Sequence, residues 1–171
     1  MHYFSTNRKS PHVGFGDAVL IGQPDDKGLY FPSEIPQLPP DFLNGLSAAS
    51  NEQIAFDVIR PFVAGEIPDD TLFEICSETV NFDFPLVPIT TRISALELFH
   101  GPTLAFKDVG ARFMSRCLQY FAHDAAGKTI VIVATSGDTG GAVAAGFHGV
   151  EGIEVVILYP KDKVSKVQEP C

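Results

Sequence analysis

Cysteine is scarce in this chain, and its three residues lie far apart. Cys76, Cys117 and Cys171 form neither a close pair nor a spacing typical of metal ligands, so the sequence predicts no metal site. An odd number of cysteines without a recognisable signal peptide fits a reducing compartment. Cys117 falls on the apolar side of a predicted helix, where we expect a small core residue rather than a nucleophile.

Positive charge and long apolar runs are scarce as well. Twelve Lys and Arg stand against 21 Asp and Glu, which gives a formal net charge of −9. Nonspecific binding to nucleic acids or anionic membranes needs a surplus of positive charge, so both are disfavoured. The longest strongly apolar run, 129–135, is far short of a membrane span. We therefore expect a soluble cytoplasmic protein with no nucleic-acid or membrane partner.

The rest of the composition is that of a packed protein. Of 171 residues, 45% are hydrophobic and 19% are charged, which suits one core with an appendage and is too apolar for disorder. After a start rich in Gly, Pro and Asp, helical patterns follow at 51–64 and 67–80, and the first is expected to kink or end at Pro61. The pattern changes after residue 84. We expect a mainly helical N-terminal region, 1–84, and the first part of an α/β domain, 85–171.

Residues 85–171 follow an α/β pattern. Two short strands are expected near their start, and a helix with one apolar face is expected over 108–121. The run "TIVIVAT" (129–135) has no polar alternation, as in a strand covered on both faces of a parallel sheet. A helix of small residues and a second apolar strand at 153–160 follow. Strand, helix and strand predict a right-handed parallel crossover.

The turn "SGDTG" joins the predicted strand to the helix of small residues. Its members are Ser136, Gly137, Asp138, Thr139 and Gly140. Ligands gather at the carboxyl ends of parallel strands, where a helix start offers free N–H groups. The Ser, Asp and Thr are candidates to cap the helix, and the glycines allow a ligand to approach the backbone closely. The spacing fits neither the dinucleotide fingerprint nor a P-loop. An anion or small-molecule site and a well-capped tight turn both remain open.

Lys107 stands at or near the start of the predicted 108–121 helix. The helix dipole disfavours a cation there by a few tenths to about 1 kcal/mol. Its neighbours Leu104, Ala105 and Phe106 are expected to desolvate the amine and favour its neutral, nucleophilic form. Such an amine suits Schiff-base formation with a carbonyl. The alternative is a lysine that extends to water or pairs with Asp108.

Two motifs together resemble those of a known family. "HGPTLAFKD" (100–108), which contains Lys107, and "ATSGDTGGA" (134–142) closely resemble threonine synthase, a fold-type II enzyme that uses pyridoxal 5'-phosphate (PLP). The opening pieces "YFST" and "FGDAVLIGQPDDKGLYFP" and the late stretch "DKVSKVQE" resemble the same family. The resemblance therefore covers nearly the whole chain. It implies that a parallel three-layer αβα sheet begins within 85–171.

The resemblance also implies an activity and a site. Threonine synthases convert O-phospho-L-homoserine and water to L-threonine and phosphate, with PLP held by the residue that matches Lys107, whose amine then transfers protons. The turn from Ser136 to Gly140 would lie beside the cofactor and receive the substrate carboxylate. His100 is left out of the catalytic set, because a structural hydrogen bond accounts for it better. Arg112 and Arg116 are expected to be solvated.

Two departures from the family pattern matter. The family's Ser-Thr-Arg is Ser-Thr-Asn here (5–7), with arginine one position later. The chain also stops at Cys171, before the glycine-rich loop that binds the PLP phosphate in this family. We interpret it as the N-terminal part of a longer enzyme that needs its missing half or a covering partner, and we expect it alone to bind PLP weakly and to be inactive. Alternatives are another fold-type II PLP lyase and a non-catalytic module that binds a phosphate ligand.

Overall fold

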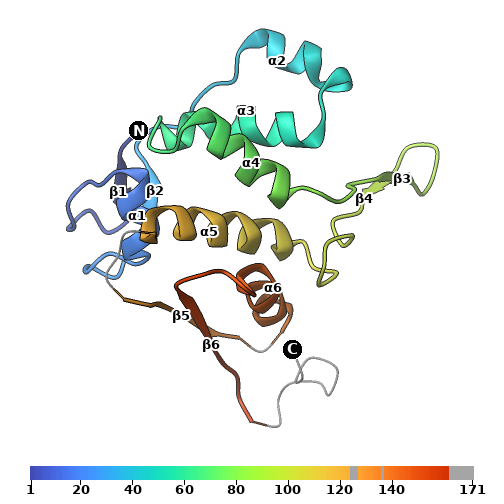
Figure 1. Ribbon diagram of the computed structural model, residues 1–171. Helices are drawn as coiled ribbons and strands as arrows, with labels where there is room; N and C mark the ends of the chain where they lie inside the picture. Colours follow the sequence, from blue (N-terminus) through green and yellow to red (C-terminus); the bar gives the residue numbers. More distant parts are fainter. Residues whose placement is uncertain (124–126, 136, 162–171) are drawn as a thin grey trace. The chain divides into compact units, whose positions relative to one another are not determined.

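The computed structural model of the chain describes residues 1–123, 127–135 and 137–161. It divides into two compact units, Met1–Val80 and Asn81–Cys171 (Figure 1). The domain division after residue 84 that the sequence suggested stays a prediction. Within the described residues, none of the helices combines the length and the apolarity needed to cross a membrane.

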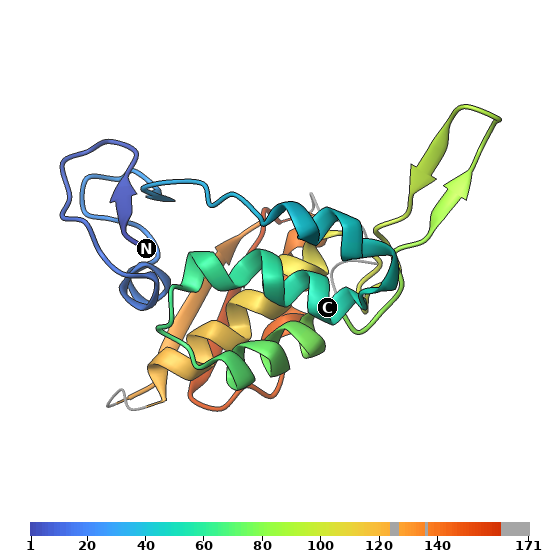
Figure 2. The ribbon, with the colours of Figure 1, turned by 90° about the horizontal axis from the view of Figure 1, so that it is seen from above.

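The first unit contains a small antiparallel sheet and several helices. Its elements are β1 (Tyr3–Ser5), α1 (Phe15–Ile21), β2 (Tyr30–Pro32), α2 (Pro40–Gly45), the 3-10 helix η1 (Leu46–Ala48), α3 (Asn51–Val63) and α4 (Asp69–Thr79). β1 pairs with β2, and α3 packs side by side with α4 (Figure 1, Figure 2). The mainly helical character expected of this part of the chain is present.

The core of the first unit lies largely along α4. The helix buries Leu72, Ile75, Cys76 and Thr79, which recur at the three- and four-residue intervals that place side chains on one helix face. Leu72 is only 1% exposed. Burial raises the pKa of the Cys76 thiol to about 11, which keeps it neutral at physiological pH. Cys76 is therefore a core residue without thiolate reactivity.

Helix α3 continues through Pro61 to Val63, so of the two outcomes expected at Pro61, a kink or an end, the end is not found, and the kink stays a prediction. Proline removes one backbone donor, but its fixed φ is compatible with a helix. Only two more residues follow before Ala64 takes a left-handed conformation, with φ of 53°, and closes the helix with its N–H on the Arg60 carbonyl. The cost of proline is therefore confined to the last turn.

Two side chains attach β1 and α1 to the end of α3. The Tyr3 hydroxyl donates a hydrogen bond to the Phe62 carbonyl at 2.9 Å, and burial together with the nearby Glu66 carboxylate raises the pKa of Tyr3 to about 12. The Glu66 carboxylate accepts hydrogen bonds from the backbone N–H groups of Phe15 and Gly16, at 2.7 and 2.9 Å. An acidic side chain thus satisfies the first donors of α1, which has no cap of its own.

Asp26 ties the N-terminal segment to the loop before β2. Its carboxylate accepts a 2.6 Å hydrogen bond from the buried Ser5 hydroxyl and further bonds from the N–H groups of Gly28, Lys9 and Ser10. The Ser5 bond first, and then these backbone bonds, lower the pKa of Asp26 to about 2. The departure from the family's Ser-Thr-Arg pattern at 5–7 therefore leaves the buried serine and its partner in place.

Replacing Asp26 with asparagine is expected to lower the stability of the first unit and to weaken its dependence on acid pH. Because the folded-state pKa is about 2, below the ordinary value of 3.8, the stability from Asp26 is present above about pH 4 and is lost as the pH falls through 2. Urea unfolding at pH 7 and pH 3 measures the effect. Asp25→Asn, at the exposed neighbouring position, is the control. Equal acid sensitivity of the chain and the Asp26 variant would contradict this role.

The second unit begins with a hairpin and continues as an α/β unit. Its elements are β3 (Leu86–Pro88), β4 (Ser94–Leu96), α5 (Lys107–Ala122), β5 (Thr129–Ala134), α6 (Asp138–Phe147) and β6 (Ile153–Leu158). β3 pairs antiparallel with β4, and β5 pairs parallel with β6 through the crossover helix α6. The predicted α/β class with a parallel strand pair is confirmed.

Small residues allow α6 to pack tightly against α5 (Figure 1). A Cβ atom added at Gly146 would lie 3.1 Å from the backbone carbonyl carbon of Ala111, closer than ordinary van der Waals contact. On α5, Cys117 is fully buried, with 0% exposure, so its predicted place in the core is confirmed. The Gly and Ala content of α6 thus sets the distance between the two helices.

The strands β5 and β6 are covered on one face only within the described residues. Burial alternates along both strands, and one set of apolar side chains is exposed, including Ile130 at 58%, Ile132 at 65% and Leu158 at 54%. The expected covering of both faces of β5 is therefore not found in this part of the chain. The reason is that α6 packs on these strands from one side.

Candidate active site

Lys107 and Asp138 bring together the first residues of two helices. Lys107 begins α5, and its Nζ lies 3.0 Å from Oδ2 of Asp138, which begins α6. The Lys107 side chain is 32% exposed, so the amine is reachable from solvent. The two predicted motifs, 31 positions apart, thus meet in one ion pair.

The surroundings of Lys107 differ from those expected. Leu104 and Phe106 are 73% and 60% exposed, and only Ala105 is buried, so the adjacent side chains do not enclose the amine as predicted. Nζ lies 4.5 Å from the centre of the Phe106 ring, a cation–π contact. The amine thus contacts both a carboxylate and an aromatic ring.

Asp138 is the first residue of α6 and not its cap. The hydrogen bond from Lys107 lowers the pKa of the Asp138 carboxyl, which is therefore ionised at neutral pH. The N-cap position belongs to Gly137, which has an extended backbone and no side-chain cap, so the expected capping by Asp138 and Thr139 is wrong. Oδ2 of the Asp138 carboxylate pairs with Lys107.

The predicted turn lies at the carboxyl end of β5. The Gly137 N–H donates to the Thr135 hydroxyl at 3.2 Å, and the Gly140 N–H donates to the Gly137 carbonyl at 3.1 Å. A hollow of about 430 Å³ opens beside the turn, between Thr135 and Tyr159 at the ends of β5 and β6. Ser136 lies outside the described residues. The binding roles predicted for Ser136, Gly137, Asp138, Thr139 and Gly140 stay predictions.

Asp108 holds the loop that leads to Lys107, a role that the sequence interpretation missed. It is 1% exposed and accepts hydrogen bonds from the Thr103 N–H at 2.9 Å and from the Thr103 hydroxyl at 2.5 Å. A Cβ atom added at Gly101 would lie 2.4 Å from its Oδ2, so the loop needs glycine there. The expected alternative, an ion pair between Lys107 and Asp108, is not found. The signal available in the sequence was an aspartate in the first turn of the predicted helix, Asp108, with a threonine five positions earlier, Thr103.

The other candidate side chains have local partners. His100 Nε2 lies 2.7 Å from a Glu97 carboxylate oxygen, and its ring stacks on Phe99. This hydrogen bond agrees with leaving His100 out of the catalytic set. Arg112 donates to the Asn81 side chain at 3.0 Å, and Arg116 approaches the Ser115 hydroxyl at 3.4 Å. Both arginines have intermediate exposure, so they keep contact with solvent as well as with these partners.

In the described part of the chain, no three His, Cys, Asp or Glu side chains come together as a metal centre would require. The nearest acidic neighbour of the candidate amine, Asp138, forms an ion pair with it. The described geometry offers an amine and a carboxylate at the starts of two helices. No arrangement of metal ligands is seen among the described residues.

The fold and the site thus define a class of α/β protein. In this class, a lysine amine lies beside a helix start at the carboxyl end of a parallel strand, as Lys107 lies beside the start of α6 after β5. Residues 2–80 match the family described as the N terminus of threonine synthase. Over 169 residues, the chain is 43% identical to threonine synthase of Haemophilus influenzae and 36% identical to that of Escherichia coli, covering 99% of this chain and 39% of each relative.

Solved structures agree with the sequence relatives. PLP-bound threonine synthase from Brucella melitensis matches with a TM-score of 0.89 and 39% identity, over 96% of this chain and 37% of that one. The yeast threonine synthase matches with a TM-score of 0.87 and 35% identity, over 98% of this chain and 37% of that one. The chain spans about two fifths of the length of the relatives it matches. The chain is thus similar to the N-terminal portion of threonine synthases, which confirms the resemblance seen in the sequence.

Proposed function

We propose that this chain supplies the N-terminal part of a PLP-dependent threonine synthase, which converts O-phospho-L-homoserine and water to L-threonine and phosphate in the cytoplasm. The observation that carries the proposal is the meeting of Lys107 with Asp138 at 3.0 Å. This pair lies in a chain that matches a PLP-bound threonine synthase over 96% of its length, with a TM-score of 0.89.

The residues at this site fit PLP. Lys107 offers a partly exposed primary amine, which is the group that the PLP aldehyde needs. The start of α6 offers backbone N–H groups and positive potential at the carboxyl end of β5, which suits a carboxylate or phosphate. When bound, PLP supplies the electron sink that stabilises negative charge on the substrate carbons.

Lys107 and Asp138 have different tasks in this proposal. Lys107 holds the cofactor and afterwards carries protons at its Nζ. Asp138 orients the Lys107 ammonium and does not deprotonate it, because a carboxyl with a lowered pKa is a weak base. The turn from Gly137 to Gly140 orients the substrate through backbone N–H groups. Asp108 holds the preceding loop and so sets the starting point of α5.

A chimera tests the proposal. This chain replaces the corresponding N-terminal part of the Haemophilus influenzae threonine synthase, to which it is 43% identical. We expect the chimera to release phosphate and form threonine from O-phospho-L-homoserine, and to be inactive with serine or threonine as substrate. A folded chimera that binds PLP and does not form threonine would refute the proposed reaction.

The isolated chain is expected to behave differently. It should bind PLP weakly and form no measurable threonine, because the matched relatives are more than twice its length. Absorbance of the PLP–lysine chromophore and a coupled phosphate assay measure both properties. Threonine formation by the 171-residue chain alone would show that the remaining portion of the relatives is not needed.

A further inference from the structure

The first unit contains a cleft that has no part in the Lys107 site. Its volume is about 650 Å³, enough for a small organic molecule. Its apolar lining includes Leu38, Pro39, Phe42 and Pro61. These residues come from the segment before α2, from α2 itself and from the last turn of α3.

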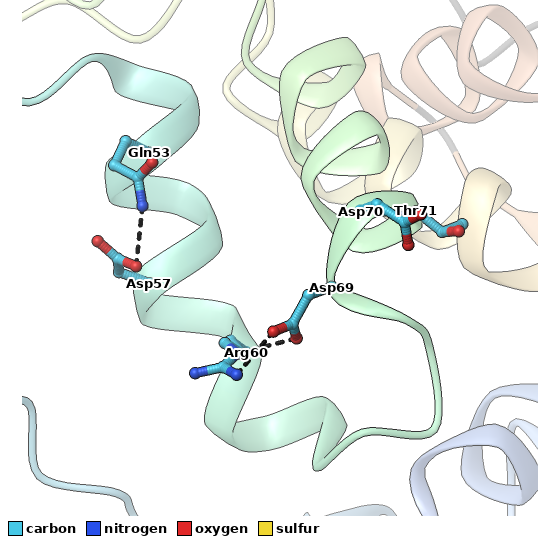
Figure 3. Close-up of polar contacts among 6 residues, drawn as sticks. All are labelled: Gln53, Asp57, Arg60, Asp69, Asp70 and Thr71. Carbon is cyan, nitrogen blue, oxygen red and sulfur yellow. Dashed lines mark hydrogen bonds and ion pairs between the residues drawn. The ribbon is translucent and has the colours of Figure 1, made fainter.

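The cation at the rim of this cleft is already neutralised. Figure 3 shows Arg60 of α3 facing Asp69 at the start of α4. Arg60 Nε and Nη2 donate to the two Asp69 carboxylate oxygens at 2.9 and 2.6 Å, a bidentate pair. The hydrogen bond from Arg60 lowers the pKa of Asp69, which is therefore ionised. An anionic ligand would have to displace Asp69 to obtain the same fork of donors.

A second carboxylate at the rim keeps bonding capacity for a ligand. Asp57 lies three residues before Arg60 on α3 and also lines the cleft. Its Oδ1 accepts a 3.0 Å hydrogen bond from the Gln53 amide (Figure 3). No hydrogen bond to Oδ2 is found among the described residues, although the Asp57 charge adds to the effect of Asp69 in raising the pKa of Arg60. The Arg60 charge is balanced by Asp69, so the rim keeps one net negative charge, that of Asp57.

The charge of the whole unit reinforces this preference. Residues 1–80 contain 12 Asp and Glu and four Lys and Arg, so they hold −8 of the chain's formal charge of −9. Such a unit raises the local concentration of cations near its surface. We propose that the cleft binds a small organic monocation, an ammonium group on an apolar stem. The ammonium pairs with Asp57, and the stem lies against Phe42 and Pro61.

Three probes with a common phenyl-ethyl framework test the charge preference. The isotope-labelled 171-residue chain is titrated by NMR with 2-phenylethylamine, 3-phenylpropionate and phenylalanine, which are a cation, an anion and a zwitterion. We expect the amine to bind at least about tenfold more tightly than the anion, with phenylalanine between them. The shifted amides should include those of Phe42 and Asp57. The affinity for the amine should fall as salt is added.

Variants assign the effect to the cleft. Asp57→Asn keeps the Gln53 hydrogen bond and should weaken amine binding by at least about tenfold, whereas Asp57→Glu should retain it. Asp70→Asn is the matched control, because it removes one charge of the same unit next to Asp69 and outside the cleft, and it should weaken amine binding far less than Asp57→Asn. Asp69→Asn releases Arg60 and should raise the affinity for 3-phenylpropionate.

Several results would overturn the proposal. In the titration, these results are no binding of the amine, equal affinity for the three probes, or tighter binding of phenylalanine or the anion than of the amine. Among the variants, the contradicting result is an equal loss of amine affinity in Asp57→Asn and Asp70→Asn. Far-UV circular dichroism of each variant separates loss of folding from loss of binding. None of these measurements involves PLP or the Lys107 site, so the outcome is independent of the proposed enzymatic function.

Discussion

Replacing Lys107 with alanine in the chimera is expected to reduce threonine formation by about 10²–10⁴-fold or more, because the variant loses both the cofactor attachment and a positioned proton carrier. The fold should remain, since Lys107 is a partly exposed first residue of α5. Steady-state phosphate release measures the rate. Borohydride reduction followed by peptide mass spectrometry identifies the side chain that carries the pyridoxyl group.

Lys128 provides the matched control. It lies in the same unit, is 67% exposed and forms an ion pair with Glu154 on β6. Lys128→Ala should therefore leave both the activity and the pyridoxyl label unchanged. A label fixed to any residue other than Lys107 would contradict the assignment, and so would full activity of Lys107→Ala.

Leu72→Ala is expected to destabilise the first unit by about 2–5 kcal/mol, the range found when a buried leucine is truncated and a cavity remains. Leu72 is 1% exposed and lies on the buried face of α4. Since small domains are stable by only about 5–15 kcal/mol, this change removes a large share of the total. Urea unfolding followed by circular dichroism measures it.

An exposed leucine in the same unit is the comparison for that prediction. Leu43 on α2 is 69% exposed, so Leu43→Ala should change the free energy of unfolding by no more than about 0.5 kcal/mol. Similar losses of unfolding free energy in the two variants would mean that the buried face of α4 does not determine the stability of this unit.

Much of the α/β unit could be predicted from local patterns. The apolar runs that became β5 and β6, and the small residues between them, permit few arrangements other than a parallel crossover. The change to helical periodicity predicted a helix over 108–121, and α5 begins one residue earlier, at Lys107. By contrast, the composition of β5 did not predict which faces of this strand are buried. An apolar run is compatible with a strand that other elements cover on one face or on both.

The candidate site was predictable only in part. Lys107 and the turn at 136–140 could be selected by residue type and by family resemblance. Their mutual arrangement could not, because the Lys107–Asp138 pair joins residues 31 positions apart and depends on how α5 packs against α6. The surroundings of Lys107 were misjudged for a related reason. Sequence neighbours such as Leu104 and Phe106 can turn outward, and only the folded backbone decides this.

The sequence alone therefore determined the α/β class, the candidate lysine and the resemblance to threonine synthase, because periodicity and motifs act over short stretches of chain. Tertiary structure decided which charges meet. It brought Lys107 and Asp138 together in an ion pair, and it placed the Ser5 hydroxyl where it donates to Asp26. It also paired Arg60 with Asp69 beside a cleft. The physical reason is that electrostatic interactions depend on distance and burial in space, and chain separation specifies neither.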